Sequence, residues 1–163
     1  MTTSIVIIAL GLLGSAFISA TETAVLGASR HRIEHRGEEG DKRARLVVSI
    51  FDQYEKFFGT ILLVGNLCNI MVASVGTTLA ISTIGGGEPT LLSTVAATGI
   101  ATVVVVVVGE LTPKTLAVVA PERWSLITAR LVLVLMTVSW PIVFAFTLVP
   151  RGIMRLFGGK ESF

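Results

Sequence analysis

The sequence predicts an all-α integral membrane protein, with three transmembrane helices and further amphipathic or bent juxtamembrane helices on the cytoplasmic side. Hydrophobic residues make up 52% of the 163 residues and charged residues only 15%, whereas soluble domains carry about 25% charged residues. Four long runs are almost free of charge, and the basic residues collect between particular runs. This composition argues against a soluble enzyme, a nucleic-acid-binding protein and a disordered chain.

Four apolar runs are long enough to be considered as membrane spans, because crossing a lipid core of about 30 Å takes about 20 residues. They cover Ser4 to Leu26, Phe57 to Ile84, Leu91 to Val108 and Trp124 to Val149. None alternates polar and apolar residues, so we expect helices and not the strands of a barrel. The first run has no Lys or Arg before it and is longer than a signal-peptide core, so we expect it to stay as a helix.

The positions of the 13 Lys and Arg residues predict the orientation of the chain. None precedes the first run or separates the second from the third, and seven lie between the first and the second. Since cytoplasmic loops are enriched in Lys and Arg, this loop is expected in the cytoplasm and the N-terminus outside. The sequence thus predicts a multi-pass protein of the cell (plasma) membrane.

The fourth run leaves two interpretations open, because basic residues flank it on both sides. Arg130 and Pro141 interrupt it, and Arg151 and Arg155 follow it. A proline removes a backbone donor, and an arginine near the start of the run can reach lipid headgroups. We favour a bent helix pair in the inner leaflet with a cytoplasmic C-terminus. The alternative is a plain fourth span with these basic residues outside.

The basic loop between the first two runs contains a predicted interfacial helix that begins after Asp41, a typical N-cap residue. Its apolar residues recur at spacings of three and four and form one stripe: Leu46, Val47, Ile50, Phe51 and Tyr54. Such a helix is expected to lie on an anionic inner leaflet. His31 and His35 are four residues apart and could hold a metal, but solvated histidines are the favoured interpretation.

Ionisable residues inside a span are costly, so they indicate function by default. The first run contains one, Glu22, at its cytoplasmic end. Ser15, Ser19 and Thr23 form a ladder at four-residue spacing, and Glu22 lies three residues after Ser19. Helical periodicity therefore places hydroxyl groups and a carboxylate on one face of this helix.

The second and third runs add further oxygen atoms. Asn66 and Asn69 are three residues apart in the second run, and Glu110 follows directly after the end of the third. Pro113 cannot donate a hydrogen bond to the carbonyl of Gly109, and glycine tolerates the resulting distortion. This frees one backbone oxygen beside a carboxylate, a device that transporters use to coordinate cations.

All these groups are hard oxygen donors, and none is a His or Cys. They suit Mg²⁺, which favours about six oxygen ligands, better than Zn or Cu; Na⁺ and Ca²⁺ stay open. Three structural alternatives compete with an ion site. The hydroxyls can bond to the preceding helical turn, the Asn side chains can join helices, and Glu110 can pair with Lys114.

Three motifs resemble those of the CorC and cyclin M (CNNM) magnesium transporters. Residues 19–24 read S-A-T-E-T-A and resemble the S-A-x-E-T-A signature of that family. Residues 65–70, G-N-L-C-N-I, and 109–117, G-E-L-T-P-K-T-L-A, are similar to its G-N-x-x-N-I and G-E-x-x-P-K-x-x-A elements. The resemblance implies a homodimer of three-span subunits with a juxtamembrane belt helix, which exports Mg²⁺ coupled to Na⁺.

The resemblance also implies a set of ion ligands, with Pro113 and Lys114 shaping the site. The expected ligands are Ser19, Glu22, Asn66, Gly109 and Glu110, with Thr23 and Asn69 as further candidates. We expect residues 1–158 to form the transmembrane domain and 159–163 to be a tail that ends before the cytoplasmic CBS domains of the family. The alternative function is a membrane anchor and dimerisation module for such a sensor. No catalytic motif supports an intramembrane hydrolase, so an enzyme is not expected.

Overall fold

The computed structural model describes residues 1–84 and 90–156, and all regular structure within them is helical. This confirms the all-α prediction. The Gly-rich segment 85–89 and the predicted tail at 159–163 lie outside the described residues. The elements are α1 (Thr2–Gly27), α2 (Arg30–Glu38), α3 (Lys42–Asp52), α4 (Tyr54–Ile84), α5 (Leu91–Val104), the π-helix η1 (Val105–Leu111), α6 (Thr112–Val119) and α7 (Pro121–Leu156).

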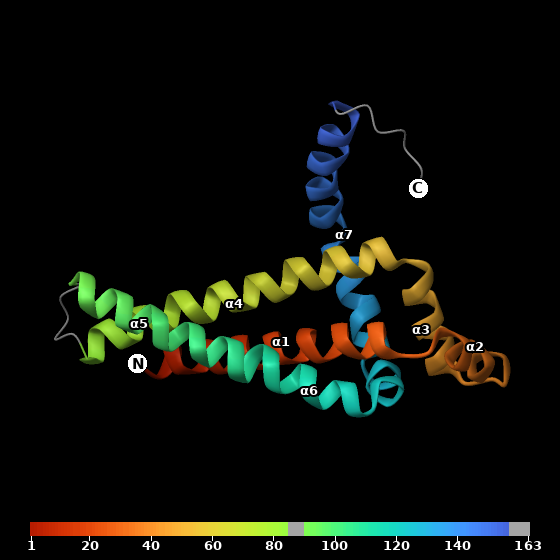
Figure 1. The fold of residues 1–163 in the computed structure, drawn as a ribbon, viewed down its shortest axis with the longest axis horizontal. Helices are drawn as coiled ribbons and strands as arrows, with labels where there is room; N and C mark the ends of the chain where they lie inside the picture. Colours follow the sequence, from red (N-terminus) through yellow and green to blue (C-terminus); the bar gives the residue numbers. More distant parts are fainter. Residues whose placement is uncertain (85–89, 157–163) are drawn as a thin grey trace.

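Three long rods lie side by side: α1, α4, and the continuous succession of α5, η1 and α6 (Figure 1). α1 and the α5–α6 rod run in the same direction, and α4 runs in the opposite direction (Figure 1). The short helices α2 and α3 connect the end of α1 to the start of α4, and α7 runs across the rods (Figure 1). The rods therefore form a bundle with α2 and α3, the predicted juxtamembrane helices, at one end.

Among the described residues, four helices are long and apolar enough to cross a membrane by length and composition: Thr2–Gly27, Tyr54–Thr83, Leu91–Val119 and Pro121–Phe146. Large apolar side chains such as Leu13 and Leu67 point away from the bundle and are 68% and 64% exposed. Apolar surface of this extent fits a hydrocarbon environment. The chain is a membrane protein, and α7 is long enough for a fourth span.

The fourth apolar run forms one helix, α7, that continues through Pro141. The expected division into a helix pair is therefore wrong for the described backbone. A proline removes one backbone hydrogen bond, but the turns on either side keep theirs when the helix packs against its neighbours. α7 crosses α4 at Gly59, where a Cβ atom would collide with Val143.

Glycines on α1 set its close approach to α4. A Cβ atom on Gly14 would lie 2.9 Å from the Sγ atom of Cys68, and one on Gly11 would meet Val72 and Met71. Without a hydrophobic driving force between helices in lipid, small residues at the contact allow close packing. The interface between α1 and α4 therefore depends on these two glycines.

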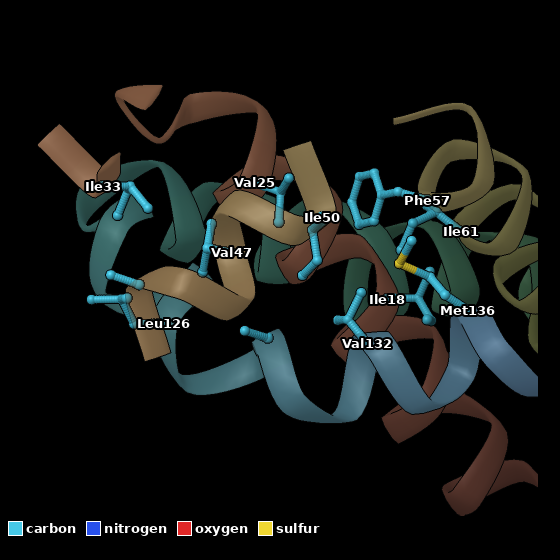
Figure 2. Close-up of a cluster of buried hydrophobic side chains, with 12 residues drawn as sticks. Ile18, Val25, Ile33, Val47, Ile50, Phe57, Ile61, Leu126, Val132 and Met136 are labelled. Atoms are coloured by element: carbon cyan, nitrogen blue, oxygen red, sulfur yellow. The ribbon is translucent and has the colours of Figure 1, made fainter. Parts of the chain in front are cut away.

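The main hydrophobic core lies where α7 meets α1, α4 and the juxtamembrane helices, not along the three rods (Figure 2). Its buried residues are Ile18, Val25, Ile33, Ala44, Val47, Ile50, Phe57, Ile61, Leu126, Ala129, Val132 and Met136. α3 begins as predicted, because the Asp41 side chain accepts hydrogen bonds from the backbone N–H groups of Arg43 and Ala44. Part of its predicted apolar stripe belongs to this core: Val47 and Ile50 are fully buried. Leu46 and Phe51 are partly buried, and Tyr54, which begins α4, is 49% exposed.

Candidate functional site

Four polar groups from three elements meet where α1, α4 and η1 pack together; we name Ser15, Asn69, Gly109 and Glu110 the polar junction. The Ser15 Oγ atom lies 2.5 Å from Asn69 Oδ1 and 3.2 Å from the Gly109 carbonyl oxygen. Asn69 Nδ2 donates to Glu110 Oε1 at 2.5 Å. Ser15 and Gly109 are buried, and Asn69 and Glu110 are partly buried. A hydroxyl, a carboxamide, a carbonyl and a carboxylate thus converge inside the bundle.

The polar junction contains more oxygen atoms that accept hydrogen bonds than donor protons to fill them. The Asn69 amide faces Glu110, so its carbonyl oxygen faces Ser15. A serine hydroxyl has a single proton, so it donates to either Asn69 or Gly109 at any moment. The other contact then brings two oxygen lone pairs together. A cation would replace this repulsion with attraction.

The backbone of η1 places Gly109 against α1. The N–H group of Thr112 donates to the carbonyl of Val107, five residues back, so the helix is widened at this point. Such π-turns inside α-helices are rare and often occur at functional sites. Pro113 follows one residue later and supplies no N–H group. The sequence predicted a distortion at Gly109, and the structure has it as a seven-residue π-helix.

Glu22 lies outside the polar junction and pairs with Lys114. The Lys114 Nζ atom is 3.0 Å from Glu22 Oε2, and the two side chains are 42% and 24% exposed. The sequence analysis considered a pair between Lys114 and Glu110, whereas in the described residues Lys114 pairs with Glu22. Glu22 is seven residues beyond Ser15 on α1, which corresponds to about 10 Å along the helix axis.

The other predicted ligands differ in their surroundings. Ser19 lies one turn beyond Ser15 on α1 and is 7% exposed. Thr23 lines a cavity of about 420 Å³ between the ends of α1 and α6. Asn66 is exposed on α4, so the structure does not bring it to the polar junction. Asn69, a further candidate in the sequence, occupies the centre instead.

Sequence reasoning did not include Ser15 among the ligands. The ladder at four-residue spacing placed it on the face of Ser19, but the family motif begins at Ser19. The structure makes Ser15 the α1 member of the polar junction. His31 and His35, the alternative metal pair, are both exposed, and His35 Nδ1 lies 3.5 Å from Glu39 Oε1.

The comparisons with known proteins identify the family of this chain. The family described as "Cyclin M transmembrane N-terminal domain" (CNNM) matches residues 5–163.

The UPF0053 inner membrane protein YfjD of Escherichia coli (strain K12) is 29% identical over 148 residues, which are 91% of this chain and 33% of YfjD. A UPF0053 protein of Haemophilus influenzae is 26% identical over 160 residues, which are 98% of this chain and 37% of that protein. The uncharacterized protein MT1889 of Mycobacterium tuberculosis is 28% identical over 162 residues, which are 95% of this chain and 47% of the relative. The chain spans about a third to a half of the length of these relatives.

Proposed function

The chain belongs to the family of the cyclin M transmembrane N-terminal domain, and from this premise we propose that it exports Mg²⁺ across the membrane, coupled to Na⁺. Membership of this family gives a membrane domain with a transport or anchor role. The choice of transport rests on one observation, the polar junction. A membrane anchor does not need a cluster of oxygen acceptors with too few hydrogen-bond donors inside its helix bundle.

The polar junction supplies ligands that suit a hard cation. Ser15 Oγ lies within hydrogen-bonding distance of oxygen atoms of Asn69 and Gly109, and Glu110 Oε1 contacts the amide nitrogen of the same Asn69 side chain. Mg²⁺ prefers octahedral oxygen coordination and keeps several of its waters, so these groups with retained waters are sufficient. Ser19, one turn away on α1, extends the same face toward Glu22.

Charge balance gives Glu22 a role in the proposed transport, although Glu22 lies outside the polar junction. The polar junction holds one carboxylate, Glu110, and a buried divalent ion needs more negative charge nearby. Glu22 is the nearest acidic residue along α1, and Lys114 neutralises it at 3.0 Å. We therefore assign Glu22, with Thr23, to the cytoplasmic end of the ion pathway. There, an arriving cation competes with Lys114 for the carboxylate.

The proposed topology has three spans, namely α1, α4 and the α5–α6 rod, with α7 as a belt along the inner leaflet. The course of α7 across the rods supports it (Figure 1). The N-terminus then lies outside the plasma membrane and the C-terminus in the cytoplasm, next to the anionic inner leaflet. The functional unit is a homodimer that continues into cytoplasmic CBS domains.

Calorimetric titration of the purified chain with Mg²⁺ tests the proposal, with Ca²⁺ and Na⁺ as separate titrants. We expect Mg²⁺ binding that is lost in Glu110→Gln, a variant that keeps the shape of the side chain and removes its charge. Proteoliposomes with an internal Mg²⁺ dye then test transport driven by a Na⁺ gradient. Binding and flux that are unchanged in Glu110→Gln would refute the site, and absence of both in the wild-type chain would favour the anchor alternative.

A further inference from the structure

A cavity of about 710 Å³ opens between the juxtamembrane helices and the start of α7. Four arginines line it from three helices: Arg32 and Arg36 of α2, Arg43 of α3 and Arg123 of α7. It lies away from the polar junction, at the end of the bundle that holds α2 and α3 (Figure 1). Ion transport through the bundle gives no reason for this concentration of positive charge.

Two of the four arginines are already neutralised. Arg32 Nε lies 2.7 Å from Glu122 Oε1, and Arg36 Nη2 lies 3.0 Å from Asp41 Oδ2. The side chains of Arg43 and Arg123 form no ion pair with any residue in the described ranges 1–84 and 90–156. The lining of the cavity therefore retains two positive charges without an ion-pair partner in those ranges, one on α3 and one on α7.

The start of α7 adds backbone donors to this charge. α7 begins at Pro121, so the N–H groups of Glu122 and Arg123 have no acceptor within the helix. The N-terminus of a helix also carries a partial positive charge. Planar guanidinium groups near free backbone donors are the common recognition elements for phosphate oxygens.

Asp41 and Glu122, the ion-pair partners of Arg36 and Arg32, also line the cavity, and the rest of its wall is apolar. Leu126 and Ile127, one turn further along α7, line it together with Ala120 and Pro121. Ile127 is 56% exposed, so apolar surface continues outward from the charged part. A free phosphate has no apolar group that could pack against this wall, whereas the glycerol and acyl groups of a phospholipid can pack against it.

We infer that this cavity binds the phosphate of an anionic phospholipid, with Arg43 and Arg123 as the phosphate ligands and Leu126 and Ile127 beside the acyl chains. The inference goes beyond ion transport and does not depend on the polar junction. The same phosphate chemistry exists in soluble phosphate esters. The test therefore includes them as a separate arm.

The test is native mass spectrometry of the purified chain in detergent micelles with phosphatidylglycerol or phosphatidylcholine added. In a micelle without other anionic lipid, a positive charge outside the cavity contributes little to binding. We expect the wild-type chain to retain phosphatidylglycerol in preference to phosphatidylcholine. Binding should weaken about tenfold in Arg123→Gln, as for the loss of one hydrogen bond to a charged group, and further in Arg43→Gln/Arg123→Gln.

The matched control is Lys42→Gln/Lys56→Gln. It removes two positive charges from α3 and α4, at positions that do not line the cavity. This control should keep the preference for phosphatidylglycerol. Equal losses in both double variants, or none in Arg43→Gln/Arg123→Gln, would overturn the inference. Displacement of the lipid by equimolar glycerol phosphate or inorganic phosphate would overturn the lipid assignment in favour of a soluble phosphate ester.

Discussion

The hydroxyl of Ser15 lies 3.2 Å from the carbonyl oxygen of Gly109, and the two helices meet there without room for one more methyl group. A Cβ atom at position 109 would lie 2.9 Å from Ser15 Oγ and 3.3 Å from Ser15 Cβ. The glycine therefore serves both the π-turn of η1 and the contact with α1. Several predictions about the proposed ion site depend on this contact.

Gly109→Ala should weaken Mg²⁺ binding at least about tenfold, because the added methyl group pushes α1 away from η1 and separates the proposed ligands. Gly99→Ala in α5 is the matched control, since no atom outside its own helix lies within 4 Å of its added Cβ. The control should bind normally and be as stable as the wild type or slightly more so. Calorimetry and thermal unfolding of both variants give the two readouts. Normal binding in Gly109→Ala would contradict the role of this contact.

Asn69→Ala should weaken Mg²⁺ binding by about 10–100-fold, whereas Asn66→Ala should change it by much less than tenfold. Asn69 bridges Ser15 and Glu110, and Asn66 is exposed on the same helix. Calorimetric titration of the two variants compares the same chemical change at two positions three residues apart. The reverse order would move the ion site along α4 from Asn69 to Asn66.

Pro113→Ala should weaken Mg²⁺ binding although it removes no side-chain ligand. Alanine restores a backbone N–H group after η1. That donor can close the turn onto the Gly109 carbonyl, which in the structure faces Ser15. Calorimetry measures the affinity, and circular dichroism checks that helix content is kept. Unchanged affinity would leave the side-chain ligands in place but eliminate the Gly109 carbonyl from the site.

Single cysteines at Glu39, Glu88 and Lys160 should separate by membrane side in a Cys68→Ala background. Because basic residues favour the cytoplasm, we expect Glu39→Cys and Lys160→Cys to react with an impermeant thiol reagent only from inside. Glu88→Cys should react from outside. Labelling of Lys160→Cys from the same side as Glu88→Cys would mean that α7 spans the membrane.

The Asp41 cap should make the thermal stability of the juxtamembrane helices measurably dependent on pH. The hydrogen bond from the Arg43 backbone N–H, followed by that from Ala44 and the contact with Arg36, lowers the pKa of Asp41 from its usual value of 3.8. A lowered pKa in the folded state means that the carboxylate stabilises the fold above pH 3.8 and that this contribution disappears as the pH falls through the lower value. The difference in melting temperature between the wild type and Asp41→Ala should therefore shrink in that acidic range.

Asp41→Asn provides the control for this measurement. Asparagine also caps helices but does not titrate, so its melting temperature relative to Asp41→Ala should not change over the same pH range. A pH dependence in Asp41→Asn equal to that of the wild type would assign the effect to another group.

The sequence alone determined the helical class, the membrane environment and the position of the cap at Asp41. Apolar runs without charge leave the backbone no partner other than itself in lipid, which forces helices regardless of the valine-rich composition of the third run. It also identified the distortion near Gly109, because a proline has no N–H group whatever its surroundings. These features are local, so neighbouring residues are enough to predict them.

Only the tertiary structure decided which polar residues meet. The sequence placed Asn66 and Asn69 on one face and treated Glu22 and Glu110 as one pair of carboxylates. The packing of α1 against α4 and η1 selects Asn69 and Ser15 for the polar junction, and Lys114 holds Glu22 elsewhere. The rotation of a helix about its axis depends on contacts such as those of Gly11 and Gly14 with α4, which are distant in sequence. Helical periodicity fixes only the faces of a single helix, so the partner of each face follows from the packing of the whole bundle.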